Sequence, residues 1–417
     1  MLSDACKIPP QNRPMLTPLN RALLVLSVTQ IIAWGAMFYA IALWGPRIAA
    51  ETGWPDLVIY GGFSLALVGS GLWSPFFGRL IDRYGGRFTM TIGSLISAVG
   101  LALLASARHE IIYAAAWAIM GCGMAACLYD PAFATLARIS GDAPARTRRA
   151  ISFLTLPGGF ASTVFWPLTL FLLQSFDWRQ TAWMYAGFLL FICAPLHRFG
   201  LPGPHEQEPP PAPEKEGSET RPEKPPLTDK NARRTAFILF ALVIAAHGFP
   251  TSALSVHVVR LLDLLGLTEG QAVAAAALVG PSQVGARILE LLFGRRLSAI
   301  GLGLVATALL PVAFLILLGV TVSPGAAMIY GLVYGASNGL VTIARGIVAL
   351  SLFGREGYGR TLGLIAAPAL AIKAAAPPVF ALGLAAFGPH AMLWVSLALA
   401  CLAFGAMALL ASHRARD

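Results

Sequence analysis

Apolar segments of membrane-spanning length recur along almost the whole chain, and they constrain its fold more than any other feature. Each is about 20 residues long, enough to cross a hydrocarbon core of ~30 Å as an α-helix. Strands of a membrane barrel would be about 10 residues long and alternate in polarity, a pattern that this sequence lacks. We therefore predict an all-α polytopic membrane protein with twelve transmembrane helices, at residues 20–46, 56–77, 88–107, 111–137, 150–174, 181–199, 235–260, 271–293, 298–320, 325–350, 361–386 and 389–411.

The composition excludes an ordinary soluble domain. The mean hydropathy is +0.70, and 57% of the residues are hydrophobic against 12% charged. The net charge of +10 is explained by basic loops at one membrane face rather than by nucleic-acid binding. The loops on the side of both termini, together with the two tails, hold 23 of the 30 Lys and Arg residues, and the opposite face holds four. This asymmetry predicts that both termini are cytoplasmic, in a plasma membrane such as a bacterial inner membrane.

The predicted spans fall into two groups of six. We expect a cytoplasmic tail at 1–19, a first bundle at 20–199, a linker at 200–234, a second bundle at 235–411 and a short tail at 412–417. The linker is rich in Pro, Glu and Lys, which is typical of disordered segments. Weak repetition links the halves through three pairs that are each 211 residues apart, Arg149 and Arg360, Pro157 and Pro368, and Pro167 and Pro378. The alternative is chance, because Pro and Arg are common at helix kinks and ends.

A charged, glycine-broken loop follows the second predicted span. Residues 78–87 read GRLIDRYGGR, and its four charges cannot lie in hydrocarbon. Asp82, at the end of the span, can hold arginines of its own loop or cap a nearby helix N-terminus. Such contacts would hold the cytoplasmic ends of the two halves together, so Asp82, Arg83 and Arg87 are candidate gating residues.

Four of the charged residues inside predicted spans are candidate site residues, because a charge in hydrocarbon costs at least ~2.5–3.5 kcal/mol and so calls for an explanation. Lys373 is near the middle of the eleventh span with no acid within one turn, which favours a cation that binds an anionic substrate. The alternative is a lysine that pairs with an acid of another helix for packing alone. Arg287 in the eighth span is a second substrate candidate, or a structural partner of Glu290 one turn away. Asp130 can carry a coupling proton or pair with Arg345 or Arg287. Arg345 gates, couples, or extends its side chain to the membrane surface.

Uncharged polar and aromatic residues complete the candidate site. His247 lies in the middle of the seventh span, and Trp34 occupies the matching place in the first, with Tyr39 about one turn away. We include these three and Asn338 as substrate-binding candidates. Ordinary packing is the alternative for His247 and for the aromatic residues, which also include Tyr129, Trp166 and Tyr334.

Cofactor and metal chemistry find no support in the sequence. The cysteines have no paired spacing in a loop, so a structural zinc or a disulfide framework is not expected. The nucleotide-binding pattern G-x-x-x-x-G-K-[ST] is missing. We expect no cofactor and no metal, with a lipid bilayer, a small anion and a coupling proton as partners of a monomer.

The loop at 78–87 resembles the signature loop of the major facilitator superfamily, roughly G-x-x-x-D-R-x-G-R-R. The residues that carry the resemblance are Gly78, Asp82, Arg83, Gly85, Gly86 and Arg87, and a weaker copy without the Asp begins at Gly294. The resemblance implies two pseudosymmetric six-helix bundles and secondary transport by alternating access. The combination of an Arg in helix 8 with a Lys in helix 11 resembles that of the oxalate:formate antiporter branch and its monocarboxylate-transporter relatives. This resemblance implies that Arg287 and Lys373 bind a carboxylate.

The leading hypothesis is therefore a proton-coupled or exchanging transporter of a small, monocarboxylate-like anion. The alternatives are an efflux pump for a drug or a metalloid, and a transporter-like sensor that binds ligand without moving it. An enzyme is not expected, because no nucleophile–base constellation is present.

Overall fold

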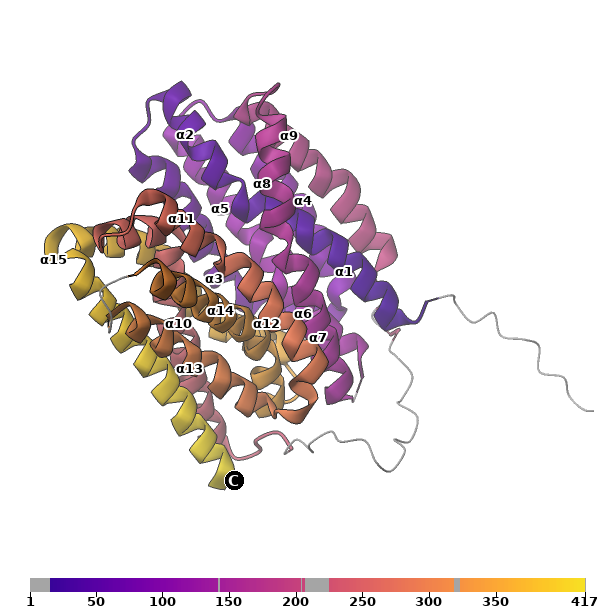
Figure 1. The fold of residues 1–417 in the computed structure, drawn as a ribbon. Coiled ribbons are helices and arrows are strands. Elements are labelled where there is room, and N and C mark those ends of the chain that lie inside the picture. Colours follow the sequence, from indigo (N-terminus) through magenta and orange to yellow (C-terminus); the bar gives the residue numbers. More distant parts are fainter. Residues whose placement is uncertain (1–15, 142, 204, 207–224, 319–322, 417) are drawn as a thin grey trace, which may run out of the picture.

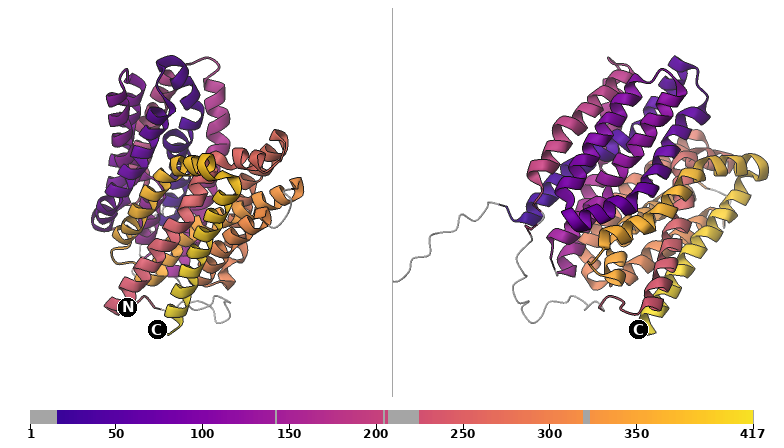
Figure 2. Two further views of the ribbon diagram at one scale, coloured as in Figure 1. Left: turned by 90° about the vertical axis from the view of Figure 1, so that its left-hand side faces the viewer. Right: turned by 180° about the vertical axis from the view of Figure 1, so that it is seen from behind.

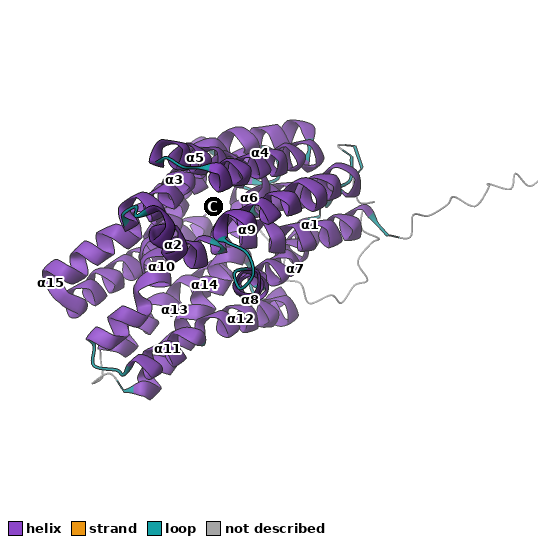
Figure 3. Ribbon diagram, turned by 90° about the horizontal axis from the view of Figure 1, so that it is seen from above, coloured by secondary structure: helices purple, strands orange, loops and turns teal. Residues whose placement is uncertain are grey.

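Helices make up almost all of the computed structural model, which describes residues 16–141, 143–203, 205–206, 225–318 and 323–416. No strand occurs in these ranges, and short loops join the helices (Figure 3). The all-α prediction is confirmed. The predicted tail up to residue 15, the middle of the predicted linker (207–224) and the last residue lie outside the described residues.

The first six spans form the N-terminal half. Three of them are divided by short interruptions, and the sixth ends in two π-helical turns. In chain order the elements are α1 (Pro18–Trp34), η1 (Gly35–Tyr39), α2 (Ile41–Thr52), α3 (Asp56–Tyr84), α4 (Gly86–Ser106), α5 (Glu110–Cys127), α6 (Tyr129–Ile139), α7 (Pro144–Gly159), α8 (Ala161–Leu172), α9 (Trp178–Phe188), η2 (Leu189–Cys193) and η3 (Leu196–Gly200).

The C-terminal half follows the linker. Its elements are α10 (Lys230–Leu264), α11 (Glu269–Ala277), α12 (Val279–Phe293), η4 (Gly294–Arg296), α13 (Ala299–Leu318), α14 (Pro324–Phe353) and α15 (Tyr358–Arg416). Eleven helical segments of the described chain are long and apolar enough to cross a membrane. The last of them contains Gly388 at φ 77° and ψ 175°, which no helix accommodates, so it supplies two spans. The described segments thus provide the twelve predicted crossings.

Local sequence explains where the helices start and break. Capping boxes start α9 at Asp177, with Gln180, and α11 at Thr268, with Gln271. Gly53 ends α2 with a φ of 70°, a conformation that suits glycine. Prolines inside α3, α7 and α10 are tolerated, because neighbouring helices can satisfy the backbone groups that they free.

The two halves lie side by side, the first in indigo and magenta and the second in orange and yellow (Figure 1). Seen from behind, the first part of α15 runs along α3, while α10 and the last part of α15 lie further out (Figure 2). α1 begins and α15 ends at the same face of the bundle, which we call the terminal face (Figure 2).

The buried core is continuous across the two halves only on one side. One apolar cluster contains Phe133 and Ile151 from the first half together with Ile343 and Ile347 from the second. A separate cluster around Phe314 belongs to the second half alone. The halves therefore share a packed core toward the terminal face, to which α6 and α7 belong.

Candidate functional site

An ion pair joins the two halves near the middle of the bundle. Arg345 in α14 places Nη2 2.7 Å from Oδ1 of Asp130 in α6. The helix of the fourth span breaks at Leu128, whose ψ is −156°, so Asp130 lies in the first turn of a new helix. A carboxylate is stabilised there by the helix dipole. Of the predicted pairings of Asp130, the structure contains the one with Arg345.

Lys373 lies beside this pair. Its side chain is half-buried, and its aliphatic part packs on Gly248, where an added Cβ would lie 3.0 Å from Cε. Its ammonium is close enough to Asp130, Arg345 and His247 to interact with each electrostatically. Lys373 therefore adds a second positive charge to a group that holds one carboxylate.

Arg287 bridges three helices and is almost completely buried, with 4% of its surface exposed. Nη1 donates to the carbonyl of Thr155 in α7 at 3.0 Å, across the boundary between the halves. Nε and Nη2 donate at 3.4 Å to the Gly339 carbonyl and to Thr342 Oγ1 in α14. The sequence-based pairing with Glu290 is not formed, because Glu290 instead binds an arginine of α7 that is described below.

Six aromatic rings of the first half form a connected group, which we call the aromatic cluster. They come from the first, second, fourth and fifth spans and are Trp34, Phe38, Tyr39, Phe63, Tyr129 and Trp166. Ring centroids of neighbours are 5.0 Å apart for Trp34 and Tyr129, 5.2 Å for Trp34 and Phe38, and 5.9 Å for Tyr39 and Trp166. The wider π-turn of η1 places both Phe38 and Tyr39 beside Trp34.

The indole of Trp34 is held in one orientation. Its Nε1 donates to Gln30 Oε1 at 3.1 Å, and Gln30 Nε2 in turn donates to the Cys127 carbonyl at 2.7 Å. Gln30 is completely buried. The polar atom of the indole is thus satisfied by the protein, while Trp34 itself is only half-buried.

The aromatic cluster touches the charged group. Tyr129 directly precedes Asp130, and its hydroxyl donates at 3.4 Å to the Thr155 carbonyl, which also accepts from Arg287. Tyr39 is likewise within electrostatic reach of Arg287. Rings of the first half and cations of the second half therefore meet at one place.

The other two predicted binding residues flank this place. His247 is buried, and its Nε2 lies 3.1 Å from Ser337 Oγ, which donates to the Ala306 carbonyl. That arrangement ties three helices of the second half together and matches the packing interpretation of His247. Asn338 is half-buried, seven residues before Arg345 and so on the same face of α14.

At the terminal face, Asp82 caps a helix of the other half. Its carboxylate accepts from the backbone N–H groups of Gly359 (2.9 Å) and Arg360 (3.0 Å) in the first turn of α15. The helices approach so closely that a Cβ on Gly359 would lie 2.6 Å from the Gly78 carbonyl oxygen. We call these residues the α3–α15 contact. Of the two predicted roles of Asp82, the structure shows the helix cap.

The neighbouring loop arginines have other partners. Arg83 is exposed and lies over the ring of Tyr84, at 5.1 Å from its centroid. Arg87 donates from Nε to the Arg198 carbonyl at 2.5 Å, within the same half. Neither of these interactions crosses between the halves.

A second contact at the terminal face joins α7 to the end of α12. Arg148 donates to Glu290 Oε1 at 3.1 Å, and to the carbonyls of Gly294 at 2.7 Å and Leu297 at 2.6 Å. A guanidinium at the last carbonyls of a helix is stabilised by the helix dipole. We call this group the α7–α12 contact. Arg148 was missed from the sequence, although it precedes one of the repeated residues, Arg149.

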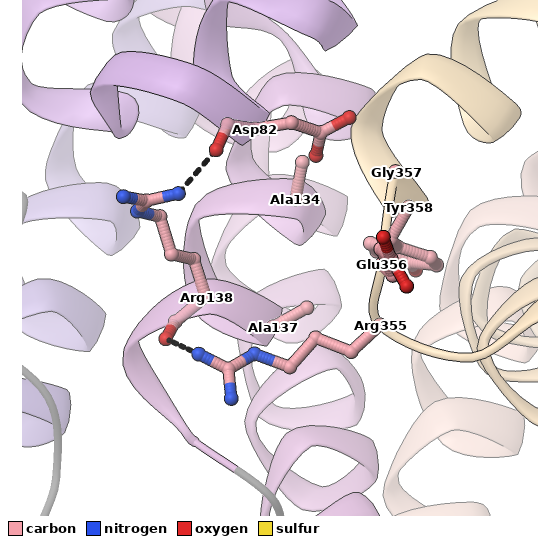
Figure 4. Close-up of a pocket in the computed structure, with 8 residues that line it drawn as sticks. All are labelled: Asp82, Ala134, Ala137, Arg138, Arg355, Glu356, Gly357 and Tyr358. Atoms are coloured by element: carbon pink, nitrogen blue, oxygen red, sulfur yellow. Dashed lines mark hydrogen bonds between the residues drawn. The ribbon is translucent and has the colours of Figure 1, made fainter.

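A cavity of about 340 Å³ lies between the halves at the α3–α15 contact (Figure 4). Arg138 donates to the backbone carbonyl of Asp82, and Arg355 donates to the Arg138 carbonyl at 2.9 Å. Arg355 extends from the second half to the first, whereas the side chain of Arg138 points to Asp82 within the first half (Figure 4). The cavity belongs to the joint at the terminal face and not to the charged group around Lys373.

The described residues contain no group of three or more His, Cys, Asp and Glu side chains that would suit a metal ion. The chemistry that they do offer is electrostatic. Two cations of one half, Arg345 and Lys373, face one carboxylate of the other, Asp130, in a part of the chain where isolated charges are costly. Such an arrangement can bind an anion and can exchange a proton at the carboxylate.

Comparison with known proteins gives the family and the fold. The Major Facilitator Superfamily model matches residues 26–290. The crystal structure of the human organic anion transporter MFSD10 (TETRAN) superposes with a TM-score of 0.69 at 18% sequence identity, over 94% of this chain and 100% of that chain. At this identity the likeness concerns the fold alone. A search of curated proteins found no match.

Proposed function

Since the chain belongs to the major facilitator superfamily, we propose that this secondary transporter moves a small organic anion by alternating access. One observation carries the proposal. Arg345 and Lys373 of the second half both interact with Asp130, the one carboxylate found with them in the described part of the bundle, and Arg287 shares the Thr155 carbonyl with the neighbouring Tyr129. The excess of positive charge near the middle of the membrane favours an anionic ligand.

We further propose that Asp130 couples transport to protons. When Asp130 is ionised, it occupies Arg345 through the ion pair of 2.7 Å. A proton on Asp130 would release Arg345, which could then bind the substrate carboxylate together with Lys373. The groups that face Asp130 are Arg345 and Lys373, with Tyr358 also within electrostatic reach.

The α3–α15 and α7–α12 contacts support a gating role at the terminal face, which we place in the cytoplasm because of its basic loops. Both contacts hold the halves together at this face. We propose that they break when the transporter opens to the cytoplasm and form again when it opens to the other side. A gate of this kind works only if the contacts differ between the two states.

Uptake by proteoliposomes with a panel of carboxylates tests the proposal. We expect Lys373→Ala to lower anion uptake by at least about tenfold, because one charged hydrogen bond is worth ~1.5–3 kcal/mol. Lys230→Ala, which removes an exposed lysine at the start of α10, is the matched control and should leave uptake unchanged. Anion flux that survives Lys373→Ala would refute the role of Lys373, and ligand binding without flux would favour a sensor.

The coupling residue has its own test. Asp130→Asn should abolish the dependence of uptake on an imposed pH gradient while preserving anion exchange, because the neutral amide mimics a permanently protonated carboxyl. Uptake of Asp130→Asn that still responds to the pH gradient would assign coupling to another group.

A further inference from the structure

We infer that the transported anion carries a flat aromatic body, so that its carboxylate binds the cations of the second half while its ring stacks on the aromatic cluster of the first. The inference rests on the proposed function and narrows its substrate from small monocarboxylates to aromatic carboxylates.

The two halves offer opposite chemistry to a ligand. The second half contributes the cations Arg287, Arg345 and Lys373, whereas the first half contributes the six rings of the aromatic cluster and the carboxylate of Asp130. An anion as small as formate would contact the cations and leave the rings unused. An aromatic acid would use both surfaces at once.

The two surfaces are close enough for one molecule to touch both. Tyr129 and Arg287 share the Thr155 carbonyl as their acceptor. The Trp34 ring lies 5.0 Å from Tyr129, so the indole is one ring away from the nearest guanidinium. A ring that stacks on Trp34 would carry a carboxylate on its edge toward the cations.

Five of the six rings are more exposed than the most deeply buried aromatic residues of the same half, whereas Tyr129 is only 6% exposed. Trp44, Tyr113 and Trp117 are at most 1% exposed. By contrast, Trp34 is half-buried and Trp166 is 44% exposed.

The cluster is also pre-organised. Gln30 fixes the Trp34 indole, and Trp166 Nε1 donates to the Tyr39 carbonyl at 3.3 Å. Both indole N–H groups are therefore directed to the protein, which leaves the ring faces for contact. The π-helical turn of η1, a feature frequent at functional sites, places Tyr39 in this group.

The test compares two classes of anion on purified protein in liposomes. Uptake of radiolabelled benzoate and phenylacetate is measured beside that of formate and oxalate, for the wild type, Trp34→Leu and Trp34→Phe. Trp394→Leu, which removes a 60% exposed tryptophan of α15, is the matched control. We expect the wild type to prefer the aromatic acids, and Trp34→Leu to reduce that preference by about tenfold, the upper range for an aromatic contact.

The outcomes separate the inference from the proposed function. Trp34→Phe keeps a ring and should retain most of the preference, which excludes a general folding defect as the cause. Equal uptake of all four anions, or a Trp34→Leu preference equal to that of Trp394→Leu, would overturn the inference and leave the proposed function intact. A failure to transport any of the anions would overturn both.

Discussion

The α3–α15 and α7–α12 contacts each join the two halves at the terminal face, and the sequence repeat relates one contact to the other. The two contacts use side chains of opposite charge. In the first, the Asp82 carboxylate binds the N-terminus of a helix. In the second, the Arg148 guanidinium binds the carbonyls at the end of a helix. Each charge has the sign that the helix dipole favours at that end. The two repeats therefore make their contact at corresponding positions, but one contact uses a carboxylate and the other a guanidinium.

The two contacts also differ in the groups that meet, which are backbone atoms in one and an arginine side chain in the other. Position 359 in the second half corresponds to position 148 in the first, with the same offset of 211 that relates Arg149 to Arg360. Glycine at 359 lets two backbones meet, whereas arginine at 148 spans a wider gap with a flexible side chain. We expect the α3–α15 contact to tolerate little change in volume, and the α7–α12 contact to tolerate more.

The largest effect is expected from Gly78→Leu. An added Cβ at Gly78 would overlap the backbone of Gly359, so the two helices could not close. Overpacking of this kind typically costs about 1–3 kcal/mol, which lowers the closed population by about tenfold or more. The reagent accessibility of a cysteine placed at Ala137, which lines the cavity, measures opening in a background without native cysteines.

Gly61→Leu is the matched control for that experiment. Gly61 is in the same helix, α3, and no described atom lies within 4 Å of an added Cβ. It should leave both labelling and transport near wild-type values. If Gly78→Leu labels no faster than Gly61→Leu, the backbone contact does not control closure.

Asp82→Asn should come next in size. The amide oxygen can still accept one of the two backbone hydrogen bonds, but the charge that favours the helix N-terminus is lost. Hydrogen bonds to charged groups contribute ~1.5–3 kcal/mol, so turnover should fall by about tenfold or more, with ligand affinity nearly unchanged. Measuring both initial uptake rate and equilibrium binding checks this, and an equal loss in the two would show that Asp82 acts on the ligand site.

Arg148→Gln should have a smaller effect than Asp82→Asn. The side chains of Arg148 and Glu290 are 15% and 3% exposed, and Arg148 also binds the carbonyls of Gly294 and Leu297. The amide of the glutamine can still donate to one of these acceptors, so a net loss of about 1 kcal/mol is expected, which predicts a change in turnover of about fivefold or less. A loss of turnover larger than that of Asp82→Asn would reverse the ranking of the two contacts.

The smallest effect should come from a carboxylate that joins elements of one half only. The N–H of Gly203 and the guanidinium of Arg21 lower the pKa of the Glu206 carboxyl below its ordinary value. Its contribution to stability is therefore present above about pH 4.3 and is lost as the pH falls through the lower folded-state pKa. Glu206→Gln should slightly lower the thermal unfolding midpoint at pH 7 and have no effect once the pH is below the lowered folded-state pKa of Glu206.

A transport assay distinguishes the role of Glu206 from the roles of the α3–α15 and α7–α12 contacts. Because Glu206 links α1 to the loop after η3 within the first half, its substitution should leave turnover unchanged. A transport defect of Glu206→Gln like that of Arg148→Gln would mean that the terminal face responds as a whole, not through two separate contacts.

Hydropathy predicts the spans well but not where the helices end. It places the end of the second span at residue 77, whereas α3 continues to Tyr84 through the charged loop. Hydropathy detects only the part of a helix that lies in the hydrocarbon. A helix can continue beyond the membrane, because its backbone hydrogen bonds are also formed in water. Pro131 follows the break at Leu128 and Gly35 starts η1, so the sequence marks both places, but the form of each break depends on packing between helices.

In the candidate site, too, some features were predictable from the sequence and others depend on packing between helices. The cost of charge in hydrocarbon was enough to single out Asp130, Arg345 and Lys373 from the sequence. Arg345 was one of two predicted partners of Asp130, but the sequence could not choose between Arg345 and Arg287, because the ion pair joins residues more than 200 positions apart. Arg148 escaped notice because an arginine in a basic loop is explained equally well by membrane orientation.

Gly388 has a consequence for how motion could be observed. Gly388 alone connects the last two spans, and Pro389 directly starts the next helix, so no flexible loop separates them. The final helix must therefore follow the displacement of its predecessor when the α3–α15 contact opens. Arg414, near its end, donates to the Pro225 carbonyl in the segment before α10. A fluorescent reporter on this helix end should record the transport cycle in real time, far from the substrate path.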